Sequence, residues 1–154
     1  MIKLQRILVP TDFSDPAANA LRYGMAFAET FRATLYLLHV VVDPFILPPA
    51  GEGYFPPPDL PQQLEERARA QLATLVPEAW RQQHPVNVAI AHGTPFVEIV
   101  RYARQEAIDL IVMGTHGRGP IAHMLLGSVA ERVIRKAPCP VLTVRPEEHE
   151  FVMP

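Results

Sequence analysis

Alternation between strand-like and helix-like patterns is the feature that most constrains this chain. Apolar runs of strand length are separated by stretches in which apolar residues recur every three or four positions, as on one face of a helix. The apolar runs are residues 7–9, 35–42, 86–91, 110–113 and 140–144. Strands that alternate with helices form a parallel sheet covered on both faces. With right-handed crossovers, the expected fold is a single-domain, Rossmann-like α/β fold: a doubly wound five-stranded parallel sheet in the order 3-2-1-4-5.

Local signals indicate where the intervening helices begin. Ser14-Asp15-Pro16 and Thr94-Pro95 each place a capping side chain before a proline in the first helical turn. The other two helices are expected from Leu64 and from Ser128. The helix after residue 94 is expected to bury Phe96, Ile99, Val100, Ala103 and Ala107, and the helix after residue 128 to bury Val129, Val133, Ile134 and Ala137.

Proline content is the one compositional anomaly, because 17 of the 154 residues are proline, about twice ordinary usage. Seven of them fall within residues 44–61, a stretch without helix or strand periodicity. The length fits one domain. We therefore expect a domain over residues 1–146 with a proline-rich insert at 44–61, followed by a polar tail at 147–154. The insert is expected to act as a semi-rigid flap or as a partner surface.

Charge and cysteine content exclude several classes of protein. Fourteen Lys and Arg residues against 16 Asp and Glu residues leave no cationic excess for binding a nucleic-acid backbone. No apolar run approaches the roughly 20 residues that span a bilayer, and no signal-peptide pattern is visible. Cys139 is the single cysteine, so no internal disulfide can form, and a cytoplasmic location is expected.

The expected topology predicts where a ligand binds. In a doubly wound sheet, ligands lie beyond the carboxyl ends of the strands where the winding reverses, here between the first and fourth strands. The first strand ends in Pro10-Thr11-Asp12, and the fourth ends in Met113-Gly114-Thr115-His116-Gly117. These two segments are distant in sequence, but the topology predicts that they lie side by side.

A glycine-bearing loop runs from this point to a helix start at Gly127-Ser128. Free N–H groups and the helix dipole favour an anion there, and glycine permits close approach of a ligand to the backbone. Gly114 and Gly117 could equally be turn glycines, with Ser128 an ordinary N-cap. The lysine of a Walker motif is absent, and the dinucleotide-like spacing from Gly117 to Ala122 lacks an acidic residue for a ribose.

The spacing Gly114-x2-Gly117-x9-Gly127-Ser128 resembles the G-2x-G-9x-G(S/T) motif of the universal stress protein family. Further similarity covers nearly the whole chain outside the insert and the tail, at residues 7–14 (ILVPTDFS), 37–40 (LLHV), 109–117 (DLIVMGTHG), 127–133 (GSVAERV) and 137–145 (APCPVLTVR). The resemblance implies a cytoplasmic ATP-binding α/β protein that is usually a homodimer.

The resemblance also implies roles for individual residues. The residues implied to contact the adenosine are Pro10, Thr11, Asp12 and Val40. Those implied to line the path of the ribose and phosphates are Met113, Gly114 and Gly117, with His116 in the same stretch. Those implied to hold the phosphates are Gly127, Ser128 and Val129. Ala130 stands where some ATP-binding members have a hydroxyl residue. Asp12 could instead cap the turn before the first helix.

These observations support a nucleotide-dependent stress-response or signalling module that binds ATP and passes its state to an unknown protein partner. The alternatives are a slow ATPase or nucleotidyl-transfer enzyme, and a dimeric scaffold with a vestigial site. Phosphoryl transfer needs charge stabilisation and a positioned nucleophile. Without a Walker lysine, paired carboxylates or an assignable base, no enzyme is expected.

Metal and partner expectations complete the prediction. His39, His92 and His116 fall near strand ends but lack local ligand spacing, so no protein-ligated metal is expected. Mg²⁺ is expected to bind through the phosphates of ATP, because it needs few protein ligands. Residues 141–144 form the expected edge strand, whose bare apolar edge favours antiparallel pairing in a homodimer.

Overall fold

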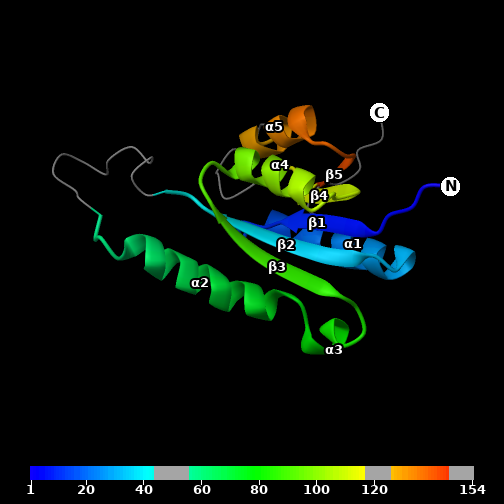
Figure 1. The fold of residues 1–154 in the computed structure, drawn as a ribbon, viewed down its shortest axis with the longest axis horizontal. Helices are drawn as coiled ribbons and strands as arrows, with labels where there is room; N and C mark the ends of the chain where they lie inside the picture. The colour runs from blue at the N-terminus through cyan, green and yellow to red at the C-terminus, as the bar shows by residue number, and fades with distance from the viewer. Residues whose placement is uncertain (44–55, 117–125, 146–154) are drawn as a thin grey trace.

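The computed structural model describes residues 1–43, 56–116 and 126–145. Its sheet holds five parallel strands in the order β3-β2-β1-β4-β5, which confirms the expected fold class (Figure 1). The strands are β1 (Arg6–Pro10), β2 (Thr34–Val41), β3 (Val86–His92), β4 (Leu110–Gly114) and β5 (Val141–Val144). The winding reverses between β1 and β4, as the sequence predicts.

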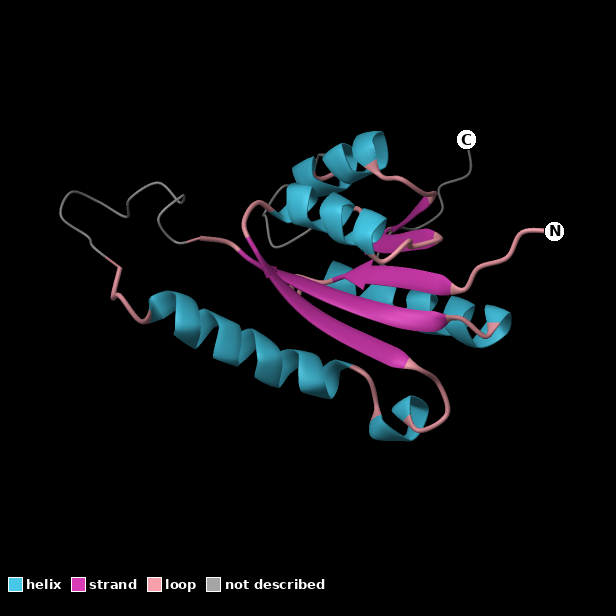
Figure 2. Ribbon diagram, viewed as in Figure 1, coloured by secondary structure: helices cyan, strands magenta, loops and turns pink. Residues whose placement is uncertain are grey.

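Helices cover both faces of this sheet (Figure 2). They are α1 (Asp15–Phe31), α2 (Leu60–Leu75), α3 (Glu78–Arg81), α4 (Pro95–Gln105) and α5 (Ser128–Lys136). The start of α1 follows the expected signal: Ser14 Oγ accepts the Ala17 N–H at 3.4 Å, and Pro16 lies in the first turn. Within the described residues, no helix is both long and apolar enough to cross a membrane.

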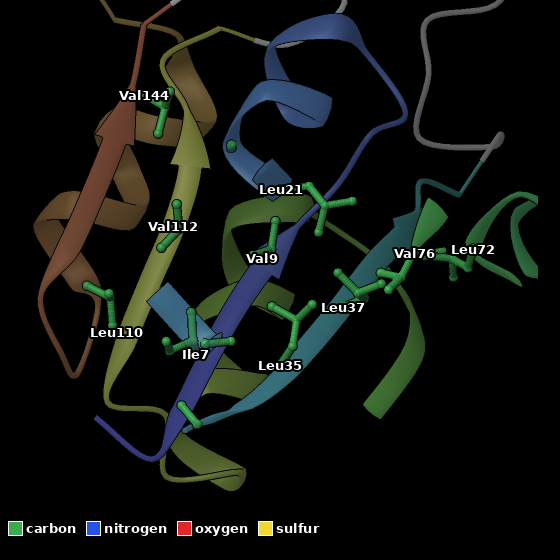
Figure 3. Close-up of a cluster of buried hydrophobic side chains, with 13 residues drawn as sticks. Ile7, Val9, Leu21, Leu35, Leu37, Leu72, Val76, Leu110, Val112 and Val144 are labelled. Carbon is green, nitrogen blue, oxygen red and sulfur yellow. The ribbon is translucent and has the colours of Figure 1, made fainter. Parts of the chain in front are cut away.

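Two apolar clusters form the core, one on each face of the sheet. Alternate residues of β1 separate between them: Ile7 and Val9 pack with α1 and α2, whereas Leu8 packs with α4 and α5. Figure 3 shows the first cluster, in which side chains from β1, β2, β4 and β5 project from the sheet. Strands covered on both faces are apolar throughout, which explains why their sequences lack the alternation of a half-exposed strand.

Some local predictions at the helix ends were wrong. Helix α2 begins at Leu60 rather than Leu64, so the last two residues of the predicted insert are helical, with Pro61 in the first turn. Ala107 was expected inside but is exposed, because α4 ends at Gln105 and the chain turns through a left-handed Ala107 (φ 49°). Ile108 is buried instead.

Helix α5 also presents a different side to the core. Ile134 was expected to be buried but is 44% exposed, whereas Ala130, three residues after the N-cap, is 3% exposed. Val133 is buried as predicted, and Val129 and Ala137 are half-buried.

The short helix α3 was not predicted; its Trp80 packs against the first cluster and stacks on His84 with ring centroids 4.3 Å apart. The expected insert outside 56–61 and the expected tail at 147–154 lie outside the described residues.

Candidate functional site

The carboxyl ends of β1 and β4 are adjacent but not paired. Register pairs between the two strands end at Leu8–Ile111, whereas β1 and β2 remain paired through Pro10–Leu38. We call these two ends, residues 10–12 and 112–116, the switch point. It lies at the position where ligands bind in doubly wound sheets.

Pro10 explains why the β1–β4 ladder stops. The Arg6 carbonyl accepts the Asp109 N–H, and the Thr11 N–H donates to the Leu38 carbonyl. Because backbone groups of successive strand residues point to opposite sides, Arg6, Leu8 and Pro10 face β4. Proline has no N–H to donate. The missing donor therefore faces β4 and leaves the end of the ladder open.

The chain leaves β1 through a tightly hydrogen-bonded turn. Buried Thr11 (8% exposed) accepts the Phe13 N–H on Oγ1 at 3.0 Å. Asp12 accepts the Ser14 N–H on Oδ1 at 3.0 Å and also accepts the Ser14 hydroxyl proton. The turn-capping alternative for Asp12 is thus present in the structure, and it uses one carboxylate oxygen. The second carboxylate oxygen, Oδ2, takes no part in these two bonds and is the atom through which Asp12 could contact a ligand.

Gly114, the last residue of β4, lies against the start of α1. A Cβ at this position would stand 3.0 Å from both Cβ and the carbonyl oxygen of Pro16. The absence of a side chain therefore lets the first turn of α1 pack on the end of β4. This contact gives Gly114 a packing role beside the ligand role that the family resemblance implies.

The α5 N-terminus is joined directly to the residues that follow β4. Gly127 is the N-cap, and its N–H donates to the Thr115 carbonyl at 2.6 Å. A Cβ on Gly127 would stand 3.0 Å from that carbonyl oxygen. Thr115 is buried at 4% exposure, and its hydroxyl lies 2.9 Å from His116 Nδ1. The positive end of the α5 dipole is thereby held beside the switch point.

Ser128 is exposed and is the first residue of α5 rather than its N-cap. Its hydroxyl therefore lies on the open side of the helix start. Val129 is half-buried and packs against the second cluster. Gly117 lies outside the described residues.

Strand β2 lies next to the switch point, on the side of β1 away from β4. Val40 is half-buried and packs against the second cluster, on the α4 and α5 face. Met113 belongs to the same cluster and is 6% exposed, so its side chain is largely enclosed by protein. On the opposite face, His39 Nδ1 lies 2.8 Å from the Thr11 carbonyl oxygen.

Sequence reasoning did not select Thr115, Phe13 or Pro16, although all three contact predicted site residues. Thr115 could have been chosen from the sequence, because it lies between Gly114 and His116 in the segment that ends the fourth strand. The contacts of Phe13 and Pro16 depend on how the turn folds back on β2 and β4, which no spacing reveals.

Two features of the described residues bear on metal and redox chemistry. No group of three His, Cys, Asp or Glu residues there could hold a metal ion. Burial raises the pKa of the Cys139 thiol, and the nearby Asp109 carboxylate acts in the same direction. A raised pKa lowers the fraction of reactive thiolate.

A family model describing the universal stress protein family matches residues 3–145. This chain belongs to the universal stress protein family. The match includes all three glycines of the motif, as well as the switch point. The resemblance seen in the sequence is therefore confirmed at the level of the family.

Individual universal stress proteins support the same assignment. The protein MJ0531 of Methanocaldococcus jannaschii is 37% identical over 95% of this chain and 85% of its own length. The solved structure of MJ0577 from that organism gives a TM-score of 0.81 at 34% identity, covering 96% of this chain and 100% of that one. A universal stress protein solved in complex with cAMP gives a TM-score of 0.58 at 26% identity, covering 94% of this chain and 98% of that one.

Proposed function

We propose that this universal stress protein binds ATP at the switch point and acts as a nucleotide-dependent stress-response or signalling module. The observation that carries the proposal is the junction between the end of β4 and the start of α5. There, the Gly127 N–H donates to the Thr115 carbonyl and holds the α5 N-terminus beside the ends of β1 and β4. Phosphate groups favour such helix N-termini. The family member that holds cAMP shows an adenine nucleotide in a relative with this fold.

The residues present fit an adenine nucleotide in two ways. A Cβ at Gly127 would meet the Thr115 carbonyl oxygen at 3.0 Å, a tight contact, so the lack of a side chain favours this close approach of the loop and helix. Exposed Ser128 adds a hydroxyl at the first position of α5. In this proposal, Gly127, Ser128 and Val129 hold the phosphates. Gly114, His116 and Gly117, with the Met113 backbone, line the path to the ribose.

The adenosine would lie nearer to β1 and β2. Pro10 leaves the edge of β1 open toward β4, and Asp12 has one carboxylate oxygen beyond its turn-capping bonds. Val40 supplies apolar contact from β2. Mg²⁺ would bind through the phosphates, because it keeps most of its water ligands. The module would act by passing its nucleotide state to a protein partner in the cytoplasm, without catalysing a reaction.

We also propose that the protein is a homodimer formed through the outer edge of β5. Among the described strands, this four-residue strand pairs with β4 alone, and Val141, Leu142 and Thr143 are half-buried. A bare apolar edge favours pairing with a second chain.

Thermal unfolding with and without Mg-ATP tests nucleotide binding. At about 100 times the Kd, a ligand that binds only the folded state adds about 2.7 kcal/mol of stability, which raises the Tm by roughly 5–10 °C. Ser128→Asp should reduce this shift, because a carboxylate at the α5 N-terminus competes with phosphate. The same charge is favourable to the helix dipole, so the ligand-free protein should unfold at the same temperature or higher.

Asn87→Asp is the matched control. It adds the same charge on exposed β3 near the amino ends of the strands, away from the switch point, and should leave the ATP-induced shift unchanged. The absence of any shift in the wild-type protein at millimolar ATP would contradict nucleotide binding. An unchanged shift in Ser128→Asp would contradict the phosphate position. Gly127→Val is a poorer test, because its side chain would meet the Thr115 carbonyl before it met a ligand.

A further inference from the structure

His39 of β2 contacts the backbone that leaves β1. Its Nδ1 lies 2.8 Å from the Thr11 carbonyl oxygen, one residue beyond the last β1–β2 register pair. A carbonyl oxygen can only accept a hydrogen bond. The Nδ1 atom must therefore carry the proton, and the contact selects this tautomer of the neutral ring.

This bond fixes the direction of the peptide between Thr11 and Asp12. The described residues contain no cis peptide bond, and in a trans peptide the carbonyl and the N–H point in opposite directions. With the Thr11 carbonyl directed at the His39 ring, the Asp12 N–H points away from that ring. His39 thus fixes the direction of the Asp12 backbone donor at the switch point.

The ring of His39 also supports the residue that follows Asp12. Phe13 has a φ of 63°, a left-handed conformation that is strained for a bulky side chain. Its ring lies 4.5 Å from the His39 ring, centroid to centroid, at an angle of 32°. The Phe13 N–H donates to Thr11 Oγ1 at 3.0 Å. Strained residues persist where surrounding contacts determine them and often mark functional sites.

We propose that His39 is a positioning residue for nucleotide binding: its Nδ1–H and its ring together hold the Thr11–Phe13 turn, and with it the Asp12 backbone, in one conformation at the switch point. This inference rests on the proposed function. It assigns His39 no direct contact with the nucleotide. It predicts that the N–H donor and the aromatic ring contribute separately to affinity, through the geometry of the turn.

The tautomer can be measured without any nucleotide. Nitrogen-15 NMR of the ligand-free protein should show that Nδ1 of His39 carries a proton. Replacing Thr11 by alanine should leave this tautomer unchanged, because the acceptor is a backbone carbonyl. A neutral ring protonated at Nε2 would overturn the proposal, since the bond to Thr11 could not then form.

Calorimetric titration with Mg-ATP tests the positioning role. His39→Phe keeps an aromatic ring but removes the donor, and should weaken binding about tenfold, the effect of one well-formed hydrogen bond. His39→Asn places an amide N–H close to the position of Nδ1 without the ring, and should bind more weakly than the wild-type protein because the contact with the Phe13 ring is lost. Leu72→Ala, which removes a fully buried side chain of α2, should lower stability and leave the ATP affinity unchanged.

Each outcome of this comparison has a separate meaning. Wild-type affinity in His39→Phe would overturn the inference while leaving the proposed function intact. A His39→Asn variant with wild-type affinity would also overturn it, because the ring would then contribute nothing. Weaker binding by Leu72→Ala would show that lost stability alone explains the effect. No binding by the wild-type protein would instead be a failure of the proposed function, which the tautomer measurement does not depend on.

Discussion

At the scale of the residue, burial changes the ionisation of Tyr102 on α4. Its ring packs edge-on against the ring of Tyr36, with centroids 6.4 Å apart. Burial raises the pKa of Tyr102 from 10.0 to about 12, and the nearby Glu106 carboxylate and Tyr36 act in the same direction. An unfolded chain would release this proton at about the ordinary value, so the folded protein holds it over a wider range of pH.

The sign of the resulting pH dependence follows from this difference. Between pH 10 and pH 12 the folded state binds more protons at Tyr102 than the unfolded state does, so stability falls as the pH rises through that range. Absorbance of tyrosinate should therefore show a late-titrating tyrosine that is missing in Tyr102→Phe. Denaturant unfolding at pH 9 and pH 11 should show a smaller loss of stability in that variant. A Tyr102 that titrates near pH 10 would contradict the prediction.

Residues identified by a motif could be placed from the sequence, whereas residues that act through the backbone could not. Pro10, Asp12 and Gly127 follow from strand ends and glycine spacing, and the structure brings them to one end of the sheet. His39 was considered only as a candidate metal ligand. Its bond to Thr11 depends on the β1–β2 register and on the direction of one peptide. Such information is absent from residue types and spacing.

At the scale of the element, a glycine sets how closely α1 lies on the sheet. A Cβ at Gly24 would overlap Cγ2 of Val9 and would stand 3.6 Å from Leu35 Cδ1. Val9 is fully buried on β1, so its stiff branched side chain has little room to move. The close approach of α1 to β1 therefore requires glycine at this position.

Gly24→Ala should destabilise the protein although alanine is the better helix former. Overpacking a core costs about 1–3 kcal/mol, which exceeds the gain of about 1 kcal/mol from helix propensity. Urea unfolding measures the difference. In the Val9→Ala background, the same Gly24→Ala change should cost less or become stabilising, because the overlapping methyl group is gone. Equal costs in the two backgrounds would place the strain elsewhere.

The ends of the helices were predicted less accurately from the sequence than their interiors. Apolar periodicity predicted α4 well but extended it to Ala107, because a small apolar residue fits either a helix or a turn. The structure ends α4 at Gln105 and buries Ile108 after a left-handed turn. Similarly, Pro61 looked like part of the insert, although proline is well suited to the first turn of a helix.

At the scale of the whole molecule, strand order was the most predictable property. Five apolar runs joined by helical stretches leave few arrangements, because right-handed crossovers and coverage of both faces exclude most of the others. The positions of the edges follow from that order: β3 and β5 each pair on one side only. Which edge joins a second chain is a property of the surface, and neither the strand order nor the core determines it.

The proposed dimer can be tested by removing one outward-facing backbone donor. The Pro140 and Val144 carbonyls accept the N–H groups of Ile111 and Thr115, so the backbone groups of Val141 and Thr143 point away from β4. Thr143→Pro removes an outward N–H without touching the β4–β5 ladder, and proline is tolerated on edge strands. Light scattering with size exclusion should show a dimer for the wild-type protein and a monomer for Thr143→Pro.

Val88→Pro is the matched control on the other edge. The Pro85 carbonyl accepts the Leu35 N–H, and the Gly93 N–H donates to the Val41 carbonyl, so the odd-numbered positions of β3 face β2 and Val88 faces outward. This variant should remain a dimer. If Val88→Pro is a monomer and Thr143→Pro is a dimer, the interface lies along β3 instead. If both remain dimers, the chains associate through a helical face, and the edge-pairing proposal is wrong.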